Sequence, residues 1–542
     1  MDSTQAGSSG PLQDFTYDDV GQIAERVLEY HSKRDGKDRQ RIIEVRNKIA
    51  DFSTSYLKKT EFALQEKTIQ KIQESISTIR DSDPDDTIIL MTAHQPNLFA
   101  YSGILRKIAL LKAVEGRISK MAGSKKVVCF YGFADHDFIN NKWVRSAEMP
   151  APLKRDGLLR FTVNLDKKDL FLPTNMIGKP SGEKLSSWRS QIEGWISENC
   201  SLAVKYAKSF DTGVDSDNIL KISKDNFAGF WKYVDDANSN ASNLAEFSSF
   251  VLSTIANNVL DTPVVFANFS DCFTAFGKEY EWLLSNAKGY SDAVEGSEAA
   301  LKGAGIDSGL TSDVGELLPV WVRCSCGSKY RLASVSPEKF EGKCMRCDKQ
   351  ASYSYEQLIA LLKSSPELFQ PKSISMPLAF SRAFDMSFYV TGLGGIGYII
   401  DSKAVSEKLG SPLPPIAYWN VPDNYTRIER LACAWEAGRI SKLYGLGASA
   451  IPVDSLSDAA KGMLAELSGK IEDGSVAKTA VSERDRQLLE MMPKSLGVQS
   501  CAVGYAINIG LGPTYRQWID FLAGGGKLNE PVGLKSAYEV SR

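Results

Sequence analysis

Two apolar runs of strand length, each followed directly by a histidine-bearing polar loop, restrict the fold of this chain more than any other feature. The first run is Thr87 to Thr92, and the second is Lys126 to Tyr131. Residues 103–115, between them, place apolar side chains on one face of a predicted helix. A helix that joins two buried strands is the βαβ unit of a parallel sheet. The sequence therefore predicts an α/β protein.

Polar side chains follow each run at the point where the predicted strand ends. Parallel strands end at one edge of their sheet, and α/β sheets bind ligands there. We therefore expect both loops to face a common cavity and to carry the catalytic groups. The residues concerned are His94, Gln95 and Asn97 after the first run, and Asp135, His136 and Asp137 after the second.

The loop after the first run is predicted to bind phosphate or another anion. A helix begins just after it, and the N–H groups at a helix N-terminus attract anions. His94 would donate a hydrogen bond to this anion and balance its charge. The same site would include Gln95 and Asn97 from the loop and Arg106 and Lys107 from the helix. The alternative is that His94 only caps or stiffens the turn.

The triplet after the second run places two carboxylates around one imidazole. Residues with one residue between them point roughly alike in a loop at a strand end, so Asp135 and Asp137 could share a face. They would bind a divalent ion, hold a substrate ammonium, or orient His136 as a general base. The alternative is a polar surface loop without function. The chain has only three histidines, which leaves few other groups for acid–base chemistry near neutral pH.

A glycine cluster follows a later apolar stretch, between Val390 and Tyr398. The cluster contains Gly392, Gly394 and Gly395, but it lacks the clear strand–GxGxxG–helix context and distant acid of a dinucleotide site. We expect it to form a wall of the substrate site or a place of close backbone packing.

Four of the nine cysteines form two close pairs, Cys324 with Cys326 and Cys344 with Cys347. A tight bend within each pair, eased by Gly327 after the first, would turn four thiolates toward one point. Four thiolates around tetrahedral Zn²⁺ leave no position for water, so the pattern predicts a structural zinc ribbon over residues 321–354. Reduced thiols or a redox dithiol are the alternative. Basic residues around the cysteines could contact RNA, although a solvated surface is the expected role.

Composition narrows the class of protein. Lys and Arg total 64 against 66 Asp and Glu, a net charge of −2, which argues against a protein that binds bulk nucleic acid or an anionic membrane. No apolar run reaches the length of about 18 residues that a membrane span needs, and the first residues lack a signal-peptide pattern. The cysteines are too sparse for a disulfide scaffold. We therefore predict a cytoplasmic protein.

The predicted organisation follows these patterns and the helical periodicity of residues 18–80. Its segments are a flexible tail (1–17), an N-terminal helical region (18–86), a first part of the core (87–320), the zinc ribbon (321–354), a second part of the core (355–424) and a C-terminal helical region (425–542).

Taken in order, four segments resemble the cysteine-adding enzymes of bacillithiol biosynthesis, the BshC family. The first loop of that family reads small residue-Gln-Gln-x-x-Leu-Phe-x-x-Gly. Ala93–Gly103 is similar to this pattern, with His94 in place of the first glutamine. Ala134–Phe138 is similar to Glu-Asp-His-Asp-Phe, with Ala134 in place of the glutamate.

The later two segments continue the resemblance. Val390–Tyr398 is similar to Val-Gly-Gly-Pro-Gly-Glu-Ile-x-Tyr, with Gly395 in place of the glutamate, and residues 410–415 are similar to Gly-x-Pro-x-Pro-Pro. The cysteine insert is not part of the usual pattern of that family. The chain is thus expected to be a divergent member with an inserted zinc ribbon.

The resemblance implies a Rossmann-like core of the kind found in nucleotidylyltransferases and class I synthetases, and a homodimer. It implies a ligase that joins an amino acid, cysteine in that family, to an amine of a small molecule, with ATP or another nucleotide as a candidate cofactor. His94 would stabilise phosphate charge, Asp135 and Asp137 would hold an ammonium or an ion, and His136 would move the proton. The alternatives are an enzyme that only adenylates a small molecule and a non-catalytic RNA- or protein-binding module.

Overall fold

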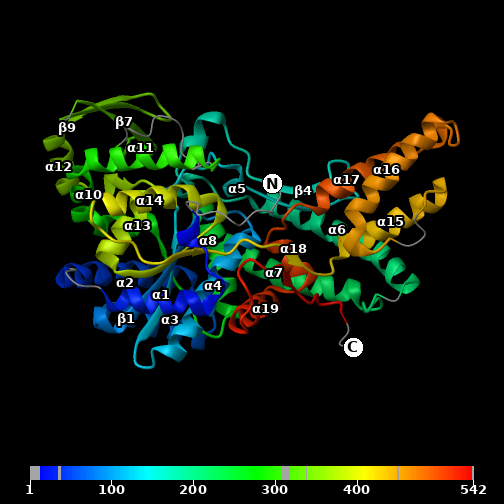
Figure 1. The fold of residues 1–542 in the computed structure, drawn as a ribbon, viewed down its shortest axis with the longest axis horizontal. Coiled ribbons are helices and arrows are strands. Elements are labelled where there is room, and N and C mark those ends of the chain that lie inside the picture. Colours follow the sequence, from blue (N-terminus) through cyan, green and yellow to red (C-terminus); the bar gives the residue numbers. More distant parts are fainter. Residues whose placement is uncertain are drawn as a thin grey trace.

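The computed structural model describes residues 12–33, 38–210, 212–306, 318–336, 338–447 and 451–539 (Figure 1). Residues 1–11 of the predicted tail lie outside these ranges, whereas Phe15 in the same segment is buried. Among the described residues, no helix has both the length and the apolar character that a bilayer span requires.

A five-stranded parallel sheet forms the centre of the molecule, which confirms the predicted α/β fold. Its order is β12-β11-β1-β2-β5, so successive strands are added first on one side of β1 and then on the other. This is the strand order of a Rossmann-like core, and its ligand crevice lies where the order reverses, between β1 and β11. The strands are β1 (Thr87–His94), β2 (Lys126–Phe133), β5 (Val265–Asn268), β11 (Met386–Thr391) and β12 (Ile416–Tyr418).

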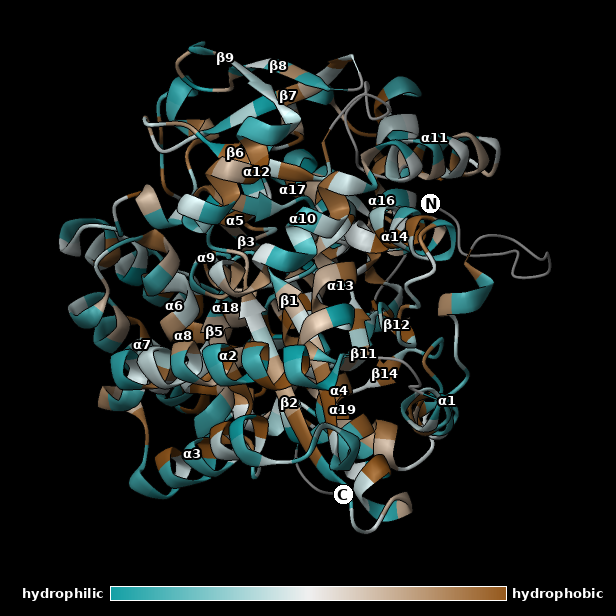
Figure 2. Cartoon of the chain, turned by 90° about the vertical axis from the view of Figure 1, so that its left-hand side faces the viewer, coloured by the Kyte–Doolittle hydropathy of each residue, from teal (hydrophilic) through white to brown (hydrophobic). Residues whose placement is uncertain are grey.

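Alternating side chains of β1 explain why the sheet is covered on both faces. Ile88 and Leu90 belong to the apolar cluster that contains helix α4, whereas Ile89 and Met91 belong to the cluster of helices α2 and α3. A strand buried on both faces reads as a continuous apolar run, as this one does. Figure 2 shows α2 lying across the front of the sheet. The helices that contact the sheet include α1 (Val20–Ser32), α2 (Arg39–Thr60), α3 (Glu66–Asp81) and α4 (Ser102–Met121). Helices α11 (Ala287–Gly303) and α14 (Ile396–Lys408) pack against each other.

A second group of helices extends from one side of the sheet (Figure 1). Helices from the predicted first part of the core pack there against helices of the C-terminal region: α6 contacts α15, and α7 contacts α18. The two segments therefore build one helical module, although they are far apart in sequence. Its members are α6 (Gly182–Ser209), α7 (Ile219–Asn240), α8 (Leu244–Val259), α15 (Ile428–Tyr444), α16 (Leu456–Glu472), α17 (Glu483–Leu496), α18 (Ala502–Asn508) and α19 (Leu511–Ala523).

The cysteine segment forms a separate antiparallel sheet, in the order β10-β6-β7-β8-β9. It lies above the parallel sheet in Figure 2. Residues 321–354 supply most of it, and β10 joins from the segment that follows. The strands are β6 (Val320–Arg323), β7 (Lys329–Ser336), β8 (Lys339–Cys344), β9 (Gln350–Ser354) and β10 (Phe369–Pro371). The short helix α12 (Tyr355–Ser364) separates β9 from β10.

Candidate functional site

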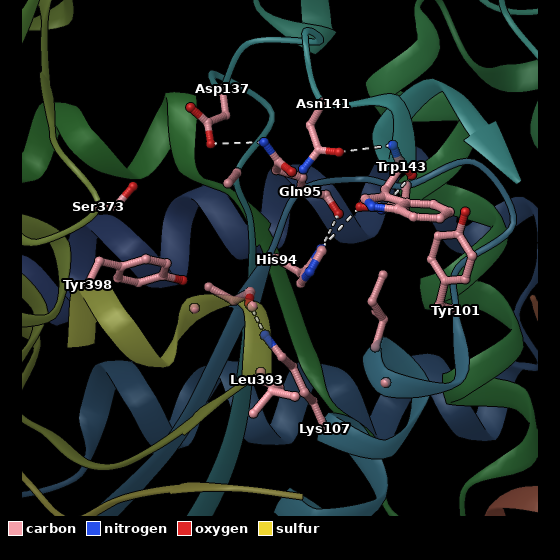
Figure 3. Close-up of a pocket in the computed structure, with 18 of the residues that line it drawn as sticks. His94, Gln95, Tyr101, Lys107, Asp137, Asn141, Trp143, Ser373, Leu393 and Tyr398 are labelled. Carbon is pink, nitrogen blue, oxygen red and sulfur yellow. Dashed lines mark hydrogen bonds between the residues drawn. The ribbon is translucent and has the colours of Figure 1, made fainter. Parts of the chain in front are cut away.

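A cavity of about 720 Å³ opens at the carboxyl ends of β1, β2 and β11, where the strand order reverses (Figure 3). Both histidine-bearing loops face it, so the two segments meet as the parallel arrangement requires. Nine of the residues predicted from the sequence line the cavity: His94, Gln95, Asn97, Lys107, His136, Asp137, Gly392, Gly394 and Gly395. Asp135 and Arg106 are not among its lining residues.

His94 ends strand β1, and its ring is fixed by two oxygen atoms. Nδ1 lies 3.1 Å from the backbone oxygen of Gln95 and 3.0 Å from Oδ1 of Asn97. Because both partners are acceptors, Nδ1 carries the proton of the neutral imidazole and Nε2 keeps a lone pair. Burial, together with the charge of Lys107, lowers the pKa of His94 to about 3. His94 is therefore neutral at pH 7, and its free nitrogen accepts a hydrogen bond rather than donating one to an anion as expected.

Lys107 presents a buried cation to the same cavity. It is 6% exposed and donates a hydrogen bond to the backbone oxygen of Ala93 over 2.8 Å. Among the described residues, no carboxylate lies within ion-pair distance of it. Burial lowers the pKa of Lys107 to about 7. A buried ammonium without a carboxylate partner is unfavourable by itself, and a bound anion would compensate its charge.

The glycine loop lies directly beside Lys107, between strand β11 and helix α14. A Cβ atom on Gly392 would lie 3.4 Å from Cε and 3.8 Å from Nζ of Lys107, so the backbone of this loop lies close to the ammonium. A Cβ on Gly395 would collide with the hydroxyl of Tyr398. The strand, the glycines and the helix thus follow one another along the chain, and Gly395, the N-cap of α14, lines the cavity. The sequence spacing alone did not make this context clear.

Asp137 and His136 form the wall opposite the glycine loop. Oδ2 of Asp137 accepts a hydrogen bond from Nε2 of Gln95 over 3.0 Å, and Oδ1 lies 3.7 Å from Nζ of Lys329. The His136 ring lies edge-on to Phe273, with 4.5 Å between ring centroids. Burial and the charge of Lys329 hold the pKa of His136 far below its ordinary value. This wall therefore presents one carboxylate and one neutral imidazole.

Asp135 does not share the face of Asp137, so that prediction is wrong. Its carboxylate is buried and accepts hydrogen bonds from the backbone N–H and hydroxyl of Ser270 and from Nδ2 of Asn175. Burial raises the pKa of Asp135 to about 6. A turn after β2 separates the directions of the two carboxylates, and the N–H and hydroxyl donors next to β5 determine where the first one points. Asp135 therefore holds the loops of β2 and β5 together.

Arg106 points away from the cavity, against the expectation that it contacts phosphate. Its guanidinium lies 2.7 Å from Oδ1 of Asp423 and above the rings of Trp419 and Trp518. Both charged side chains are 1% exposed. Arg106 and Lys107 are about 100° apart around α4, so the helix can direct only one of them to the cavity.

Several lining residues were not among the site residues predicted from the sequence. Tyr101, Trp143, Trp321 and Tyr398 give the cavity an aromatic rim, and Glu148 adds a second carboxylate, which Arg160 contacts at 3.1 Å. They come from separate segments that meet only in the folded chain. Lys329 is one of the basic residues around the cysteines, for which we expected a solvated surface, but its side chain is buried.

The four cysteines converge as predicted. Their sulfur atoms all lie within 4.8 Å of one another, with 3.7 Å between Cys324 and Cys347 and 3.5 Å between Cys326 and Cys344. Zn–S bonds of about 2.3 Å in tetrahedral geometry place sulfurs about 3.8 Å apart. Gly327, with a φ of +90°, allows the bend after the first pair. The cluster therefore fits a metal ion such as zinc.

No family model and no curated protein matches the chain. The resemblance to the BshC family therefore stays a prediction.

Proposed function

We propose that the chain is a BshC-like ligase, which activates the carboxylate of an amino acid with a nucleotide and joins it to an amine of a small molecule. One observation carries the proposal: the uncompensated Lys107 and the glycine loop face a neutral His94 and the Asp137 carboxylate across one cavity. The crevice of a Rossmann-like sheet is also where such enzymes hold their substrates.

The Lys107 side of the cavity would bind the phosphate groups. The ammonium supplies the charge, Gly392 lets a ligand approach the backbone, and the N-terminus of α14 supplies oriented N–H groups. These groups also stabilise the negative charge that leaves with the phosphate, because they are already oriented before the reaction.

The opposite wall would hold the amine. Asp137 would bind the ammonium form of the amine, which releases one proton to solvent before the free amine attacks the activated carbonyl carbon. Nε2 of His94 would accept the second proton from the nitrogen as the new bond forms. The bond from nitrogen to carbon forms, and the bond from that carbon to the phosphate-bearing oxygen breaks. Holding both reactants in one cavity lowers the entropic part of the barrier by several kcal/mol, on the order of 5.

The cysteine cluster would hold Zn²⁺ through Cys324, Cys326, Cys344 and Cys347. Four thiolates fill its coordination sphere, so the ion supplies structural support rather than a reactive water.

Single-turnover assays of the full chain with ATP, a panel of amino acids and a panel of amino sugars test the proposal. We expect one combination to give an amide product together with nucleotide cleavage. Lys107→Met should lower kcat/KM at least about 100-fold, corresponding to roughly 2.7 kcal/mol of lost transition-state stabilisation, whereas Lys120→Met, on an exposed face of the same helix, should leave it unchanged.

Other outcomes contradict the proposal. Release of pyrophosphate without any amide indicates an enzyme that only adenylates its substrate. Absence of turnover with every combination, or full activity of Lys107→Met, excludes the ligase mechanism described above.

A further inference from the structure

The cysteine sheet is part of the cavity rather than a separate module. Trp321 of β6 and Pro371 of β10 line the cavity, as does Ser373 just after β10. Trp321 also packs against Phe138, the residue that follows Asp137, with 6.1 Å between ring centroids. A change in the cysteine sheet therefore reaches the wall that carries Asp137.

Lys329 makes the most direct connection between the cysteines and this wall. It is fully buried, and its Nζ lies 3.7 Å from Oδ1 of Asp137 and 4.7 Å from the centroid of Phe138. Its backbone oxygen accepts a hydrogen bond from the N–H of Met345, next to Cys344, over 3.0 Å. The cysteine loop thus fixes the backbone of Lys329, while the head of its side chain lies at Asp137.

The connection continues to both cavity histidines. Asp137 accepts the hydrogen bond from Gln95, which adjoins His94. The charge of Lys329 acts on His136, the residue before Asp137, and lowers its pKa. The buried cation at this position therefore acts directly on His136 and is connected to His94 through Asp137 and Gln95.

A second set of contacts also connects the cysteine sheet to the Asp137 loop. The hydroxyl of Ser328 donates to the backbone oxygen of Phe171 over 2.7 Å, and Arg346 lies 2.9 Å from Asp169. In turn, the N–H of Thr174 donates to the backbone oxygen of Asp137 over 3.0 Å. The segment between Asp169 and Thr174 is thus held by the cysteine sheet on one side and by the Asp137 loop on the other.

We infer that Lys329 is a positioning residue: metal binding at the four cysteines fixes its backbone, and its ammonium then holds the Asp137 loop in the geometry of the cavity. The metal site would thus control whether the cavity is correctly formed. The inference rests on the proposed function only for the identity of the substrate. The coupling between the metal site and the cavity is a property of the protein without substrate.

The three histidines allow a test without any substrate. His94 and His136 line the cavity, whereas His31 contacts Ser387 and Asp85, at the opposite end of the sheet. In the full chain labelled with ¹³C at histidine Cε1, each histidine gives one NMR signal. We expect removal of zinc with a chelator to shift or broaden the signals of His94 and His136 and to leave that of His31 in place.

Lys329→Met, measured with zinc present, isolates the side chain. We expect it to retain one equivalent of zinc by metal analysis and to shift the same two signals. Subsequent chelation should move them less than in the wild-type protein. Lys339→Met, on an exposed part of the same sheet, is the matched control and should behave as wild type.

Three results would overturn the inference. They are unchanged cavity signals in zinc-loaded Lys329→Met, an equal effect of chelation in this variant and the wild type, or no effect of chelation on the wild type. If the chelated protein unfolds, the zinc-loaded variant still decides, because it does not depend on metal removal. If the chain has no ligase activity, the proposed function is wrong. The NMR experiment still tests the coupling, because it needs no substrate.

Discussion

Two neighbouring cations on helix α4 face opposite environments. Arg106 is directed to the C-terminal helices, where Asp423 neutralises its charge and two tryptophan rings cover it. Lys107 is directed to the cavity, where it has one backbone acceptor and no carboxylate partner among the described residues. Both side chains are almost fully buried. A buried cation with a carboxylate partner stabilises the fold, whereas a buried cation without one is available to bind an anion.

The same contrast separates Asp135 from Asp137. Asp135 is surrounded by three donors from Ser270 and Asn175, and its carboxylate holds two loops together. Asp137 accepts one hydrogen bond from Gln95, lies 3.7 Å from the ammonium of Lys329 and faces the cavity. Residue type therefore did not distinguish the structural group from the group available to a ligand, but the number of satisfied partners did.

The largest effect is expected from Arg106→Met. Removing the guanidinium leaves the buried Asp423 carboxylate without its cation, which should lower the free energy of unfolding by about 3–5 kcal/mol. Denaturant unfolding monitored by tryptophan fluorescence measures it. Arg117→Met, on an exposed position of the same helix, should change stability by less than about 0.5 kcal/mol. If Arg106→Met lost no more stability than Arg117→Met, the contrast between Arg106 and Lys107 would be contradicted.

Lys107→Met should have the opposite sign. Removing a buried, unpaired ammonium should raise the free energy of unfolding by about 1–3 kcal/mol at pH 7, despite the lost hydrogen bond to Ala93. The pKa of Lys107 is about 7 in the folded chain and 10.5 in the unfolded chain, so protonation favours the unfolded wild-type protein below pH 10.5. The stability that Lys107→Met gains should therefore shrink as the pH rises toward 10.5. A variant less stable than the wild type at pH 7 would show that Lys107 is a structural cation like Arg106.

The smallest effect concerns pH and anion binding. Sulfate keeps its charge between pH 5 and 9, so it reports the charge of the site. Its affinity should fall as the pH rises above 7, by up to about tenfold per pH unit, because Lys107 then loses its proton. Calorimetric titration at several pH values measures this, with Lys107→Met as the control that removes the dependence. A flat profile in the wild type would place the anion elsewhere.

Much of the site could be predicted because parallel strands impose it. Apolar runs of strand length identified β1 and β2, and their shared polarity brought His94 and His136 to one edge of the sheet. The cysteine cluster was equally local, because its ligands come in two close pairs whose bends are set by the residues between them. The first inference used only the apolar pattern and the common direction of parallel strands. The second used only the spacing of the cysteines.

Periodicity and spacing in the amino-acid sequence were thus sufficient for the α/β fold, the two histidine-bearing strand ends and the cysteine cluster. Only the tertiary structure decided that Lys107 rather than Arg106 enters the cavity, that Asp135 turns toward Ser270, and that Lys329 reaches Asp137. The physical reason is that the direction of a charged side chain depends on the partners that compensate it. Those partners come from segments distant in the chain, so no local pattern encodes them.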